Sequence, residues 1–320
     1  VLSNPIISFV SQLTESEKVA WLDILSAKLP NECIKLDKDL SAYEKSQCEI
    51  AIVANPDPII LSQYTNLTWV QSLWAGVDAL VSQLTENNQH PSFKLIRLID
   101  PLLAQTMSEA VLTWVLYLHR DTPKYLKQQK SGEWKQHRYL LPQARTVGIL
   151  GLGKLGELSA LRLNDNGFNV LGWSQSKKLI KGVHCYSGND GLVTMVEQCH
   201  IIICLLPLTS DTYQLIDNKL LKKLPKGASL INFARGGIVA NEDLIQYLDS
   251  DHLEHAILDV FEQEPLDKND PYWSHEKITV LPHISAPTHI ESAGNIVAKN
   301  IRTYRLNGEL PLYIDWKKGY

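Results

Sequence analysis

The sequence has no excess of basic residues, no long apolar run and little cysteine. Of its 320 residues, 31 are Lys or Arg and 35 are Asp or Glu, which gives a formal net charge of −4. A nucleic-acid-binding surface needs clustered basic charge, so we expect no nucleic-acid partner. No apolar stretch approaches the roughly 20 residues that a membrane-spanning helix requires. We therefore expect no membrane partner either.

The cysteines are too few and too irregularly placed for a disulfide framework or a zinc site. Their number is odd and none forms a C-x-x-C pair; they are Cys33, Cys48, Cys185, Cys199 and Cys204. Isolated cysteines are more often buried packing residues, so we expect reduced thiols and no bound metal. Residues 1–5 also lack the basic segment and apolar stretch of a secretory signal. These features together predict a cytoplasmic protein.

Short apolar runs alternate with helical patterns along the chain, which predicts an α/β fold with parallel strands. A length of 320 residues is long for one core and suits two domains. The first block, up to about residue 100, is expected to contain a helix at Glu15–Leu29 and strands at Ile6–Val10, Ile50–Ala54, Trp69–Leu73 and Leu95–Ile99. The second block is expected to contain strands at Thr146–Leu150, Asn169–Trp173, Ile201–Leu205, Ser229–Asn232, His255–Asp259 and Ile278–Leu281.

A long apolar helix is predicted between these blocks. Its apolar residues, from Met107 to Leu118, recur at helical spacing, and Leu112 and Leu116 widen the apolar surface. We expect this helix to be buried on most sides, as it would be between two domains or at a dimer contact. Further helices are expected at Lys154–Asn166, from Pro123, at Leu192–Glu197, through Leu248 with Asn241 as N-cap, and at Ile290–Leu306.

A glycine-rich turn follows the first strand of the second block. Gly151-Leu152-Gly153-Lys154-Leu155-Gly156 matches G-x-G-x-x-G, with a predicted strand before it and a helix after it. In such a turn the glycines allow a tight bend, close approach to a pyrophosphate and close packing of helix on strand. The helix N-terminus then favours the anion. This context predicts a dinucleotide-binding site.

The end of the next strand indicates which dinucleotide binds. An NAD site usually has an acidic residue there to hold the ribose 2′-hydroxyl. Here the segment is Trp173-Ser174-Gln175-Ser176-Lys177-Lys178, without a carboxylate. Hydroxyls, an amide and two cations suit a 2′-phosphate, so we expect NADP(H) to be preferred, with NADH possible. A solvated basic loop is the alternative interpretation.

Three polar residues follow three predicted parallel strands. Arg235 comes after residues 229–231, Glu264 after 256–258 and His283 after 278–280, and each strand is expected to be buried. Ligands of an open parallel sheet bind beyond the carboxyl ends of its strands. Arg235 can clamp a carboxylate or carbonyl, and His283 beside a carboxylate can act as general acid or base. From spacing alone, Glu262 competes with Glu264 as the partner of His283.

These motifs resemble those of the D-2-hydroxyacid dehydrogenase family. The residues that carry the resemblance are Gly151-Leu152-Gly153-Lys154-Leu155-Gly156, Asn232-Phe233-Ala234-Arg235-Gly236-Gly237, Asp259-Val260-Phe261-Glu262-Gln263-Glu264-Pro265 and Leu281-Pro282-His283-Ile284-Ser285. Within the family, the chain looks most like the bacterial A-type glyoxylate/hydroxypyruvate reductases. The resemblance implies two Rossmann-like domains with parallel sheets. A discontinuous, flavodoxin-like substrate domain would comprise residues 1–100 and 287–320, and an NAD(P)-binding domain residues 101–286.

The resemblance also implies roles for individual residues. Arg235 would bind the substrate's carboxylate and carbonyl, and His283 would donate the proton with Glu264 as its partner. Asp259 would contact the nicotinamide carboxamide. The predicted substrate loop is Trp74, Ala75 and Gly76, with backbone N–H groups receiving the carboxylate and Trp74 either capping the substrate or packing in the core. Further cofactor contacts are implied at Leu206, Pro207, Thr212 and Ala234.

The expected function is therefore NADPH-dependent reduction of glyoxylate and hydroxypyruvate to glycolate and D-glycerate, in a homodimer without a bound metal. One alternative is another 2-oxo acid reductase, of D-lactate or phenylpyruvate type. A nucleotide-sensing, corepressor-like binding protein is the alternative from a different class. The full set of Arg235, Glu264 and His283 favours an enzyme over that binding protein.

Overall fold

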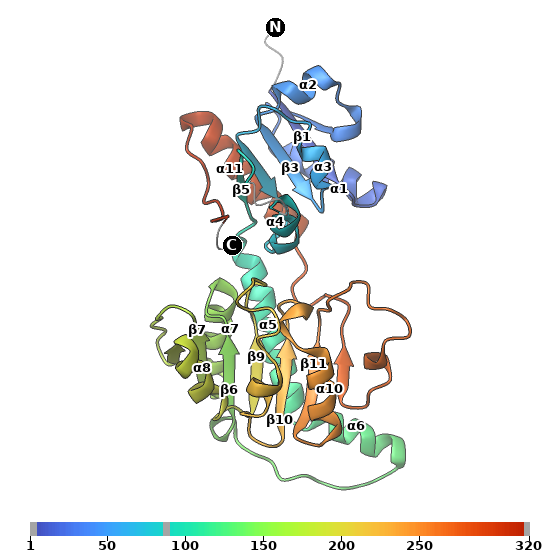
Figure 1. Cartoon of the computed structure of the whole chain (residues 1–320), viewed down its shortest axis with the longest axis vertical. Helices are drawn as coiled ribbons and strands as arrows, with labels where there is room; N and C mark the ends of the chain where they lie inside the picture. The colour runs from blue at the N-terminus through green and yellow to red at the C-terminus, as the bar shows by residue number, and fades with distance from the viewer. Residues whose placement is uncertain (1–4, 86–89, 317–320) are drawn as a thin grey trace. The chain divides into compact units, whose positions relative to one another are not determined.

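A computed structural model describes residues 5–85 and 90–316 of the chain (Figure 1). Residues 1–4, part of the segment considered above for a secretory signal, lie outside the described range. The chain divides into two compact units: a first unit up to Leu102 and again from Thr288, and a second unit, Leu103–Pro287. Among the described residues, no helix is long and apolar enough to cross a membrane.

The first unit is built on a five-stranded, all-parallel sheet. Its strand order is β2-β1-β3-β4-β5, the order of flavodoxin-like folds. Its elements are β1 (Ile6–Ser11), α1 (Glu15–Lys28), β2 (Cys33–Leu36), α2 (Ala42–Gln47), β3 (Ile50–Ala54), α3 (Pro58–Leu61), β4 (Trp69–Ser72), α4 (Asp78–Leu84), β5 (Lys94–Ile96) and α11 (Ile290–Asn307). The last helix therefore joins strands from the other end of the chain.

Helices α1 and α11 pack closely on one face of this sheet. Trp21 and Leu25 of α1 and Val297 and Ile301 of α11 are buried in one cluster with the strands. At Gly294, an added Cβ would lie 2.6 Å from a side-chain carbon of Ile24 in α1. Only a glycine lets the two helices approach this closely, so the C-terminal helix is part of the first unit's core.

The second unit contains a seven-stranded, all-parallel sheet in the order β12-β11-β10-β9-β6-β7-β8. From β6 the sheet continues through β7 to β8 on one side, and from β9 it continues through β10 to β12 on the other. The β6–β9 pair is therefore the topological switch point, where doubly wound sheets bind ligands. The elements are α5 (Pro101–His119), α6 (Thr122–Ser131), β6 (Thr146–Leu150), α7 (Lys154–Asp165), β7 (Asn169–Ser174), β8 (His184–Ser187), α8 (Gly188–Val196), β9 (Ile201–Cys204), α9 (Asn218–Leu221), β10 (Ala228–Asn232), α10 (Asn241–Asp249), β11 (Leu253–Leu258) and β12 (Ile278–Val280).

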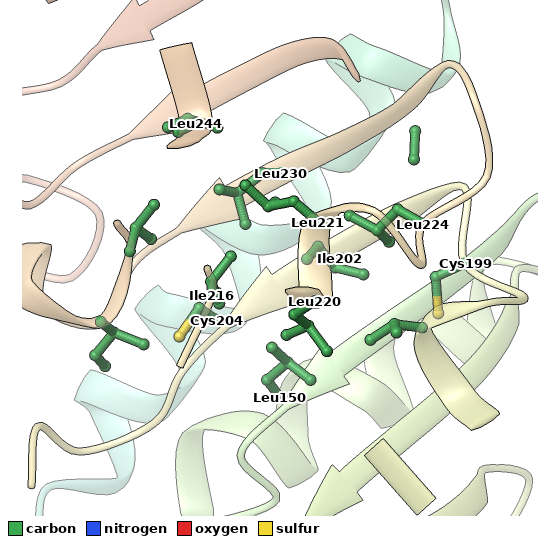
Figure 2. Packing of buried hydrophobic residues seen from close by; sticks show 14 of the residues in the cluster. Leu150, Cys199, Ile202, Cys204, Ile216, Leu220, Leu221, Leu224, Leu230 and Leu244 are labelled. Atoms are coloured by element: carbon green, nitrogen blue, oxygen red, sulfur yellow. The ribbon is translucent and has the colours of Figure 1, made fainter. Parts of the chain in front are cut away.

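Both faces of this sheet are covered by apolar helix faces. Residues of α5 and α7 pack on one face, and residues of α8, α9 and α10 pack on the other. Figure 2 shows Leu220 and Leu221 of α9 among Leu150, Ile202 and Leu230 from β6, β9 and β10. Each fully buried side chain of this kind contributes about 1.5–3 kcal/mol relative to an exposed one. The core thus fixes the strand ends that carry the polar residues.

The predicted strands are confirmed, with differences at the edges. Strands β2 and β8 were not predicted, because they are short, half-buried edge strands without an apolar run. Strand β5 ends at Ile96, three residues earlier than expected. The expectation of a buried β12 was wrong, since all three of its residues are only partly buried at the sheet edge.

Two helix predictions were also wrong. The N-cap of α10 is Ala240, and no side chain caps this helix, so Asn241 is its first helical residue instead of its cap. Helix α5 is not buried on most sides within the chain, because Leu116 is 38% exposed. One face of α5 packs on the sheet, and the widened apolar surface that Leu116 adds lies on the other side of the helix.

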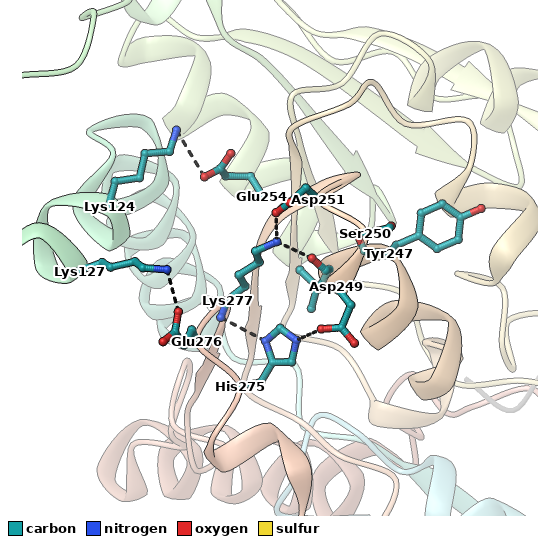
Figure 3. A network of polar contacts seen from close by, with 11 residues as sticks. Lys124, Lys127, Tyr247, Asp249, Ser250, Asp251, Glu254, His275, Glu276 and Lys277 are labelled. Atoms are coloured by element: carbon teal, nitrogen blue, oxygen red, sulfur yellow. Dashed lines mark hydrogen bonds and ion pairs between the residues drawn. The ribbon is translucent and has the colours of Figure 1, made fainter.

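The amino ends of β11 and β12 lie among paired charges (Figure 3). Lys127 contacts Glu276 at 2.8 Å, Lys124 contacts Glu254 at 3.4 Å, and Lys277 pairs with Asp251. Exposed pairs of this kind contribute roughly 0–1 kcal/mol each. This edge is therefore charge-compensated.

Candidate active site

The glycine-rich turn connects β6 to α7. Gly151 has a φ of 103°, and its N–H donates to the carbonyl of Trp173 at 2.8 Å. A Cβ on Gly156 would lie 1.8 Å from the Gly151 carbonyl oxygen, so helix and turn touch there. A Cβ on Gly153 would meet nothing within 4 Å, and no side chain caps α7 at this residue. The open space beside free helix N–H groups fits a dinucleotide pyrophosphate.

The end of β7 offers polar and basic groups. Residues 175–178 are exposed, and the Ser174 hydroxyl donates to the Ser176 carbonyl at 2.7 Å. The Trp173 side chain packs in the apolar core of the second unit. This side chain is 4% exposed and its Nε1–H donates to the Gly188 carbonyl at 2.8 Å. The indole thus belongs to the core, which leaves only the Trp173 backbone for a cofactor.

The loop after β9 lies beside the glycine-rich turn. A Cβ on Gly151 would be 2.8 Å from the Leu205 carbonyl oxygen. In this loop Leu206 is buried, Pro207 is exposed, and the Thr212 hydroxyl donates to the Pro207 carbonyl at 2.7 Å. These predicted cofactor residues therefore flank the switch point.

The turn that carries Arg235 is held by Asn232. The Asn232 side chain accepts from the Ala234 N–H at 3.1 Å and donates to the Arg235 carbonyl at 3.0 Å. At Gly236, a Cβ would lie 2.0 Å from the Phe261 carbonyl carbon, so this turn touches the backbone of the loop that leads to Glu264. Asn232 was named only as part of its motif; the signal for its supporting role is an asparagine at a strand end directly before a turn.

His283 and Glu264 form a direct pair. The distance between His283 Nδ1 and Glu264 Oε2 is 2.7 Å, while Glu264 Oε1 accepts from the Phe261 N–H at 2.9 Å. Glu262 instead accepts from the Tyr213 hydroxyl at 3.2 Å. The side chains of His283 and Glu264 are 51% and 34% exposed, so a ligand can reach the pair.

The electrostatics of this pair favour a charged imidazole. The hydrogen bond to Glu264 raises the pKa of His283, against the lowering effects of burial and of the Arg235 charge. Burial alone would raise the pKa of Glu264, but hydrogen bonds from His283 and Phe261 outweigh burial and lower it. The Arg235 charge acts on both pKa values, so the guanidinium lies near the pair.

Asp259 holds the backbone on which His283 sits. Its carboxylate is 2% exposed and accepts from the N–H groups of Ile284 at 2.8 Å and Ser285 at 2.9 Å. His283 itself has a φ of 54°, a left-handed conformation that costs a non-glycine residue roughly 1–3 kcal/mol. The two hydrogen bonds fix this turn, and each carboxylate oxygen keeps acceptor capacity for a ligand.

The predicted substrate loop lies at the end of β4, in the first unit. The indole of Trp74 is half-buried, packs edge-on against Trp21 at 6.3 Å and donates to the Asn55 side chain at 2.9 Å. Ala75 is half-buried and Gly76 is exposed. Among the described residues, neither the Ala75 nor the Gly76 N–H donates a hydrogen bond. The loop therefore offers two free backbone donors.

Comparison with known proteins identifies this arrangement. The family model "D-isomer specific 2-hydroxyacid dehydrogenase, NAD binding domain" matches residues 112–285, more than half of the chain. The chain belongs to the D-isomer-specific 2-hydroxyacid dehydrogenase family. It is thus an NAD(P)-dependent enzyme that reduces 2-oxo acids, and the fold predicted from the sequence is confirmed. Among the described residues, no cluster of metal-ligating side chains is present.

Solved structures of the family cover nearly the whole chain. A D-isomer-specific 2-hydroxyacid dehydrogenase from Xanthobacter autotrophicus Py2, in complex with NADPH and MES, is 33% identical over 99% of this chain and 100% of that one, with a TM-score of 0.91. The NADPH-dependent glyoxylate/hydroxypyruvate reductase SMc02828 of Sinorhizobium meliloti, with NADP and sulfate, is 31% identical over 98% and 99%, with a TM-score of 0.88. A 2-hydroxyacid dehydrogenase described as probable, from Rhizobium etli CFN 42, was solved with NADP, HEPES and L(+)-tartaric acid. It is 28% identical over 99% of each chain, with a TM-score of 0.88.

Proposed function

We propose that this dehydrogenase is an NADPH-dependent reductase of glyoxylate and hydroxypyruvate, giving glycolate and D-glycerate. The observation that carries the proposal is the 2.7 Å pair of His283 and Glu264. This pair and the glycine-rich turn both follow carboxyl ends of strands in the same parallel sheet. The likeness to the Sinorhizobium meliloti glyoxylate/hydroxypyruvate reductase supports the choice of substrates.

The residues divide the reaction among them. Arg235 clamps the carboxylate and polarises the carbonyl of the 2-oxo acid. His283 donates its Nδ1–H to Glu264, so its other nitrogen, Nε2, supplies the proton to the carbonyl oxygen. Glu264 keeps the imidazole charged until that transfer. The bound reduced nicotinamide supplies the hydride that arrives at the keto carbon.

Three further groups complete the proposed site. Asp259 contacts the nicotinamide carboxamide while it holds the turn of His283. The free N–H groups of Ala75 and Gly76 receive the substrate carboxylate, since a turn with unpaired amides attracts an anion. Trp74 has its indole N–H already bonded to Asn55, so it presents an apolar edge to a small substrate.

The preference for NADPH rests on the end of β7. Exposed Ser176 and Lys177 replace the carboxylate that would hold a ribose 2′-hydroxyl, and they suit a 2′-phosphate. Three solved relatives contain NADPH or NADP, which supports this choice.

The proposed assembly is a homodimer in the cytoplasm. The apolar surface that Leu112 and the exposed Leu116 give to α5 supports a second copy of the chain as partner, because an apolar helix face gains from burial. The five free cysteines support a reducing compartment.

The test is a panel of glyoxylate, hydroxypyruvate, pyruvate and phenylpyruvate, each assayed with NADPH and with NADH. We expect the highest kcat/KM with glyoxylate or hydroxypyruvate and NADPH. A maximum with pyruvate or phenylpyruvate would assign the chain to a D-lactate or phenylpyruvate type instead. A clear advantage for NADH would overturn the cofactor preference, and absence of turnover across the panel would favour a nucleotide-sensing protein.

A further inference from the structure

Arg97 stands at the carboxyl end of β5, beside the proposed substrate loop. Strands β4 and β5 pair with Gln71 opposite Ile96, so the next residue, Arg97, lies level with Ser72. The N–H of Leu98 then donates to the Trp74 carbonyl at 2.9 Å. The backbone at Arg97 is thereby fixed next to the chain that leads into Ala75 and Gly76.

Arg97 differs from the other arginines of the first unit in having no partner within residues 5–85 and 90–316. Arg305 contacts Glu32 at 3.0 Å and Glu49 at 2.7 Å, and Arg302 donates to the Lys28 carbonyl. For Arg97, no hydrogen bond, ion pair or ring contact is formed with any described residue. Its side chain is nevertheless half-buried. Burial lowers the pKa of Arg97, and no neighbouring carboxylate opposes that shift.

An unpaired, half-buried guanidinium does not stabilise a fold. Removing it from water costs free energy, and no opposite charge returns that cost. The same guanidinium becomes favourable when an anion binds, because charge-assisted hydrogen bonds are the strong ones and a planar fork matches a carboxylate. Such a group therefore indicates a ligand that is negatively charged.

We propose that Arg97 binds the substrate's C1 carboxylate together with the Ala75 and Gly76 amides. This inference rests on the proposed function and assigns a guanidinium of the first unit to the substrate's anionic group. Every 2-oxo acid carries this carboxylate, so the contact contributes affinity for the whole substrate class. Glyoxylate, which has no side chain, gains as much from it as longer substrates.

The test compares Arg97→Met, Arg97→Lys and, as a matched control, Arg305→Met. We expect Arg97→Met to raise KM for glyoxylate about 10- to 100-fold, the effect of losing a charged hydrogen bond. Its kcat should change less than about threefold, the Kd of NADPH should be unchanged, and Tm should stay the same or rise. Arg97→Lys should restore part of the affinity. Arg305→Met should lower Tm and leave KM unchanged.

A second readout does not depend on turnover. Oxalate, a dicarboxylate that cannot be reduced, should raise the Tm of the wild-type protein loaded with NADP and fail to do so in Arg97→Met. If the wild type reduces 2-oxo acids but Arg97→Met keeps its KM and its oxalate shift, the role of Arg97 is overturned and the proposed function stands. If no 2-oxo acid is reduced while the oxalate shift requires Arg97, the anion site stands and the proposed function falls. A lower Tm with unchanged KM would make Arg97 structural, and a KM effect confined to longer substrates would overturn the C1 assignment.

Discussion

At the scale of single residues, the pairing of His283 with Glu264 sets the pH range in which the proposed general acid is charged. Its pKa is raised above 6.5 chiefly by the hydrogen bond to Glu264. A raised pKa means that the imidazolium persists to higher pH and is lost as pH rises through that value. The pair's contribution to stability follows the same direction: the histidine's share is present below about pH 6.5 and disappears above the raised pKa.

We expect kcat/KM for reduction to fall as pH rises, with a midpoint above 6.5, and Glu264→Gln to move this midpoint to lower pH. The amide has no charge to stabilise the imidazolium, so the pKa of His283 should drop. The measurement is the pH profile of kcat/KM at saturating NADPH. His283→Ala serves as control, with a loss of about 10²–10⁴-fold in rate and no midpoint in this range. A midpoint that is the same in wild type and Glu264→Gln would contradict the assignment.

At the level of single residues, the sequence allowed prediction of the polar side chains that follow strands. It revealed fewer of the residues whose hydrogen bonds hold those side chains in place. Arg235, Glu264 and His283 were predicted because each follows an apolar run within a few residues, and the family resemblance chose Glu264 over Glu262. The bonds of Asp259 to the Ile284 and Ser285 amides were not predictable, since they depend on how two loops fold against each other. The burial of the Trp173 indole was also missed, because a strand-end position does not say which face a side chain occupies.

At the scale of elements, the turn from β6 to α7 uses two of its glycines for different purposes. Gly156 is required by packing, because a Cβ there would collide with the Gly151 carbonyl at 1.8 Å. Gly153 meets no such neighbour, and its free space is where the pyrophosphate is expected. A methyl group added at Gly156 should therefore affect folding, and one added at Gly153 should affect cofactor binding.

We expect Gly153→Ala to keep the wild-type Tm but weaken NADPH binding at least tenfold, and Gly156→Ala to lower Tm by several degrees. The first methyl occupies space intended for ligand, whereas the second forces α7 away from the turn. Calorimetry and NADPH fluorescence titration measure the two effects. Equal loss of Tm in both variants would show that both glycines are required for packing. Normal NADPH binding by Gly153→Ala would show that the pyrophosphate does not bind beside Gly153.

Central strands were predictable from sequence, and edge strands were not. The strands β3, β9 and β10 are apolar runs buried on both faces, so their positions follow from hydrophobicity alone. At the edges, β2 and β8 are short and half-buried, and their pairing with a neighbour decides their structure. The start of α10 shows the same limit, because Asn241 has the right chemistry for a cap but lies one residue inside the helix.

At the scale of the whole molecule, the residues predicted to bind the cofactor and those of the predicted substrate loop follow strands of two different sheets. The predicted cofactor residues, from Gly151 to Asp259, all belong to the second unit, and Trp74 to Gly76 belong to the first. A ligand stabilises the part that binds it, by about 2.7 kcal/mol at 100 times its Kd. The two units should therefore respond differently to the dinucleotide.

We expect NADP to slow amide hydrogen exchange in the β6–α7 turn and at the end of β7, and to leave β1, β3 and β4 unchanged. The reason is that bound phosphates occupy the free N–H groups at the start of α7. NAD at the same concentration is the control and should protect the end of β7 less. Protection confined to the first unit would disprove the location of the cofactor site.

The helix α11 completes the first sheet's core from the far end of the chain, where Val297 and Ile301 pack with Trp21 and Leu25 of α1. During synthesis, everything between β5 and α11 leaves the ribosome before this helix does. Until α11 is made, the first sheet therefore keeps exposed the part of its apolar face that α11 covers, while the second sheet assembles. The second unit can therefore complete its fold before the first unit, although synthesis of the first unit begins earlier. Chaperones should be needed chiefly between the synthesis of β5 and that of α11.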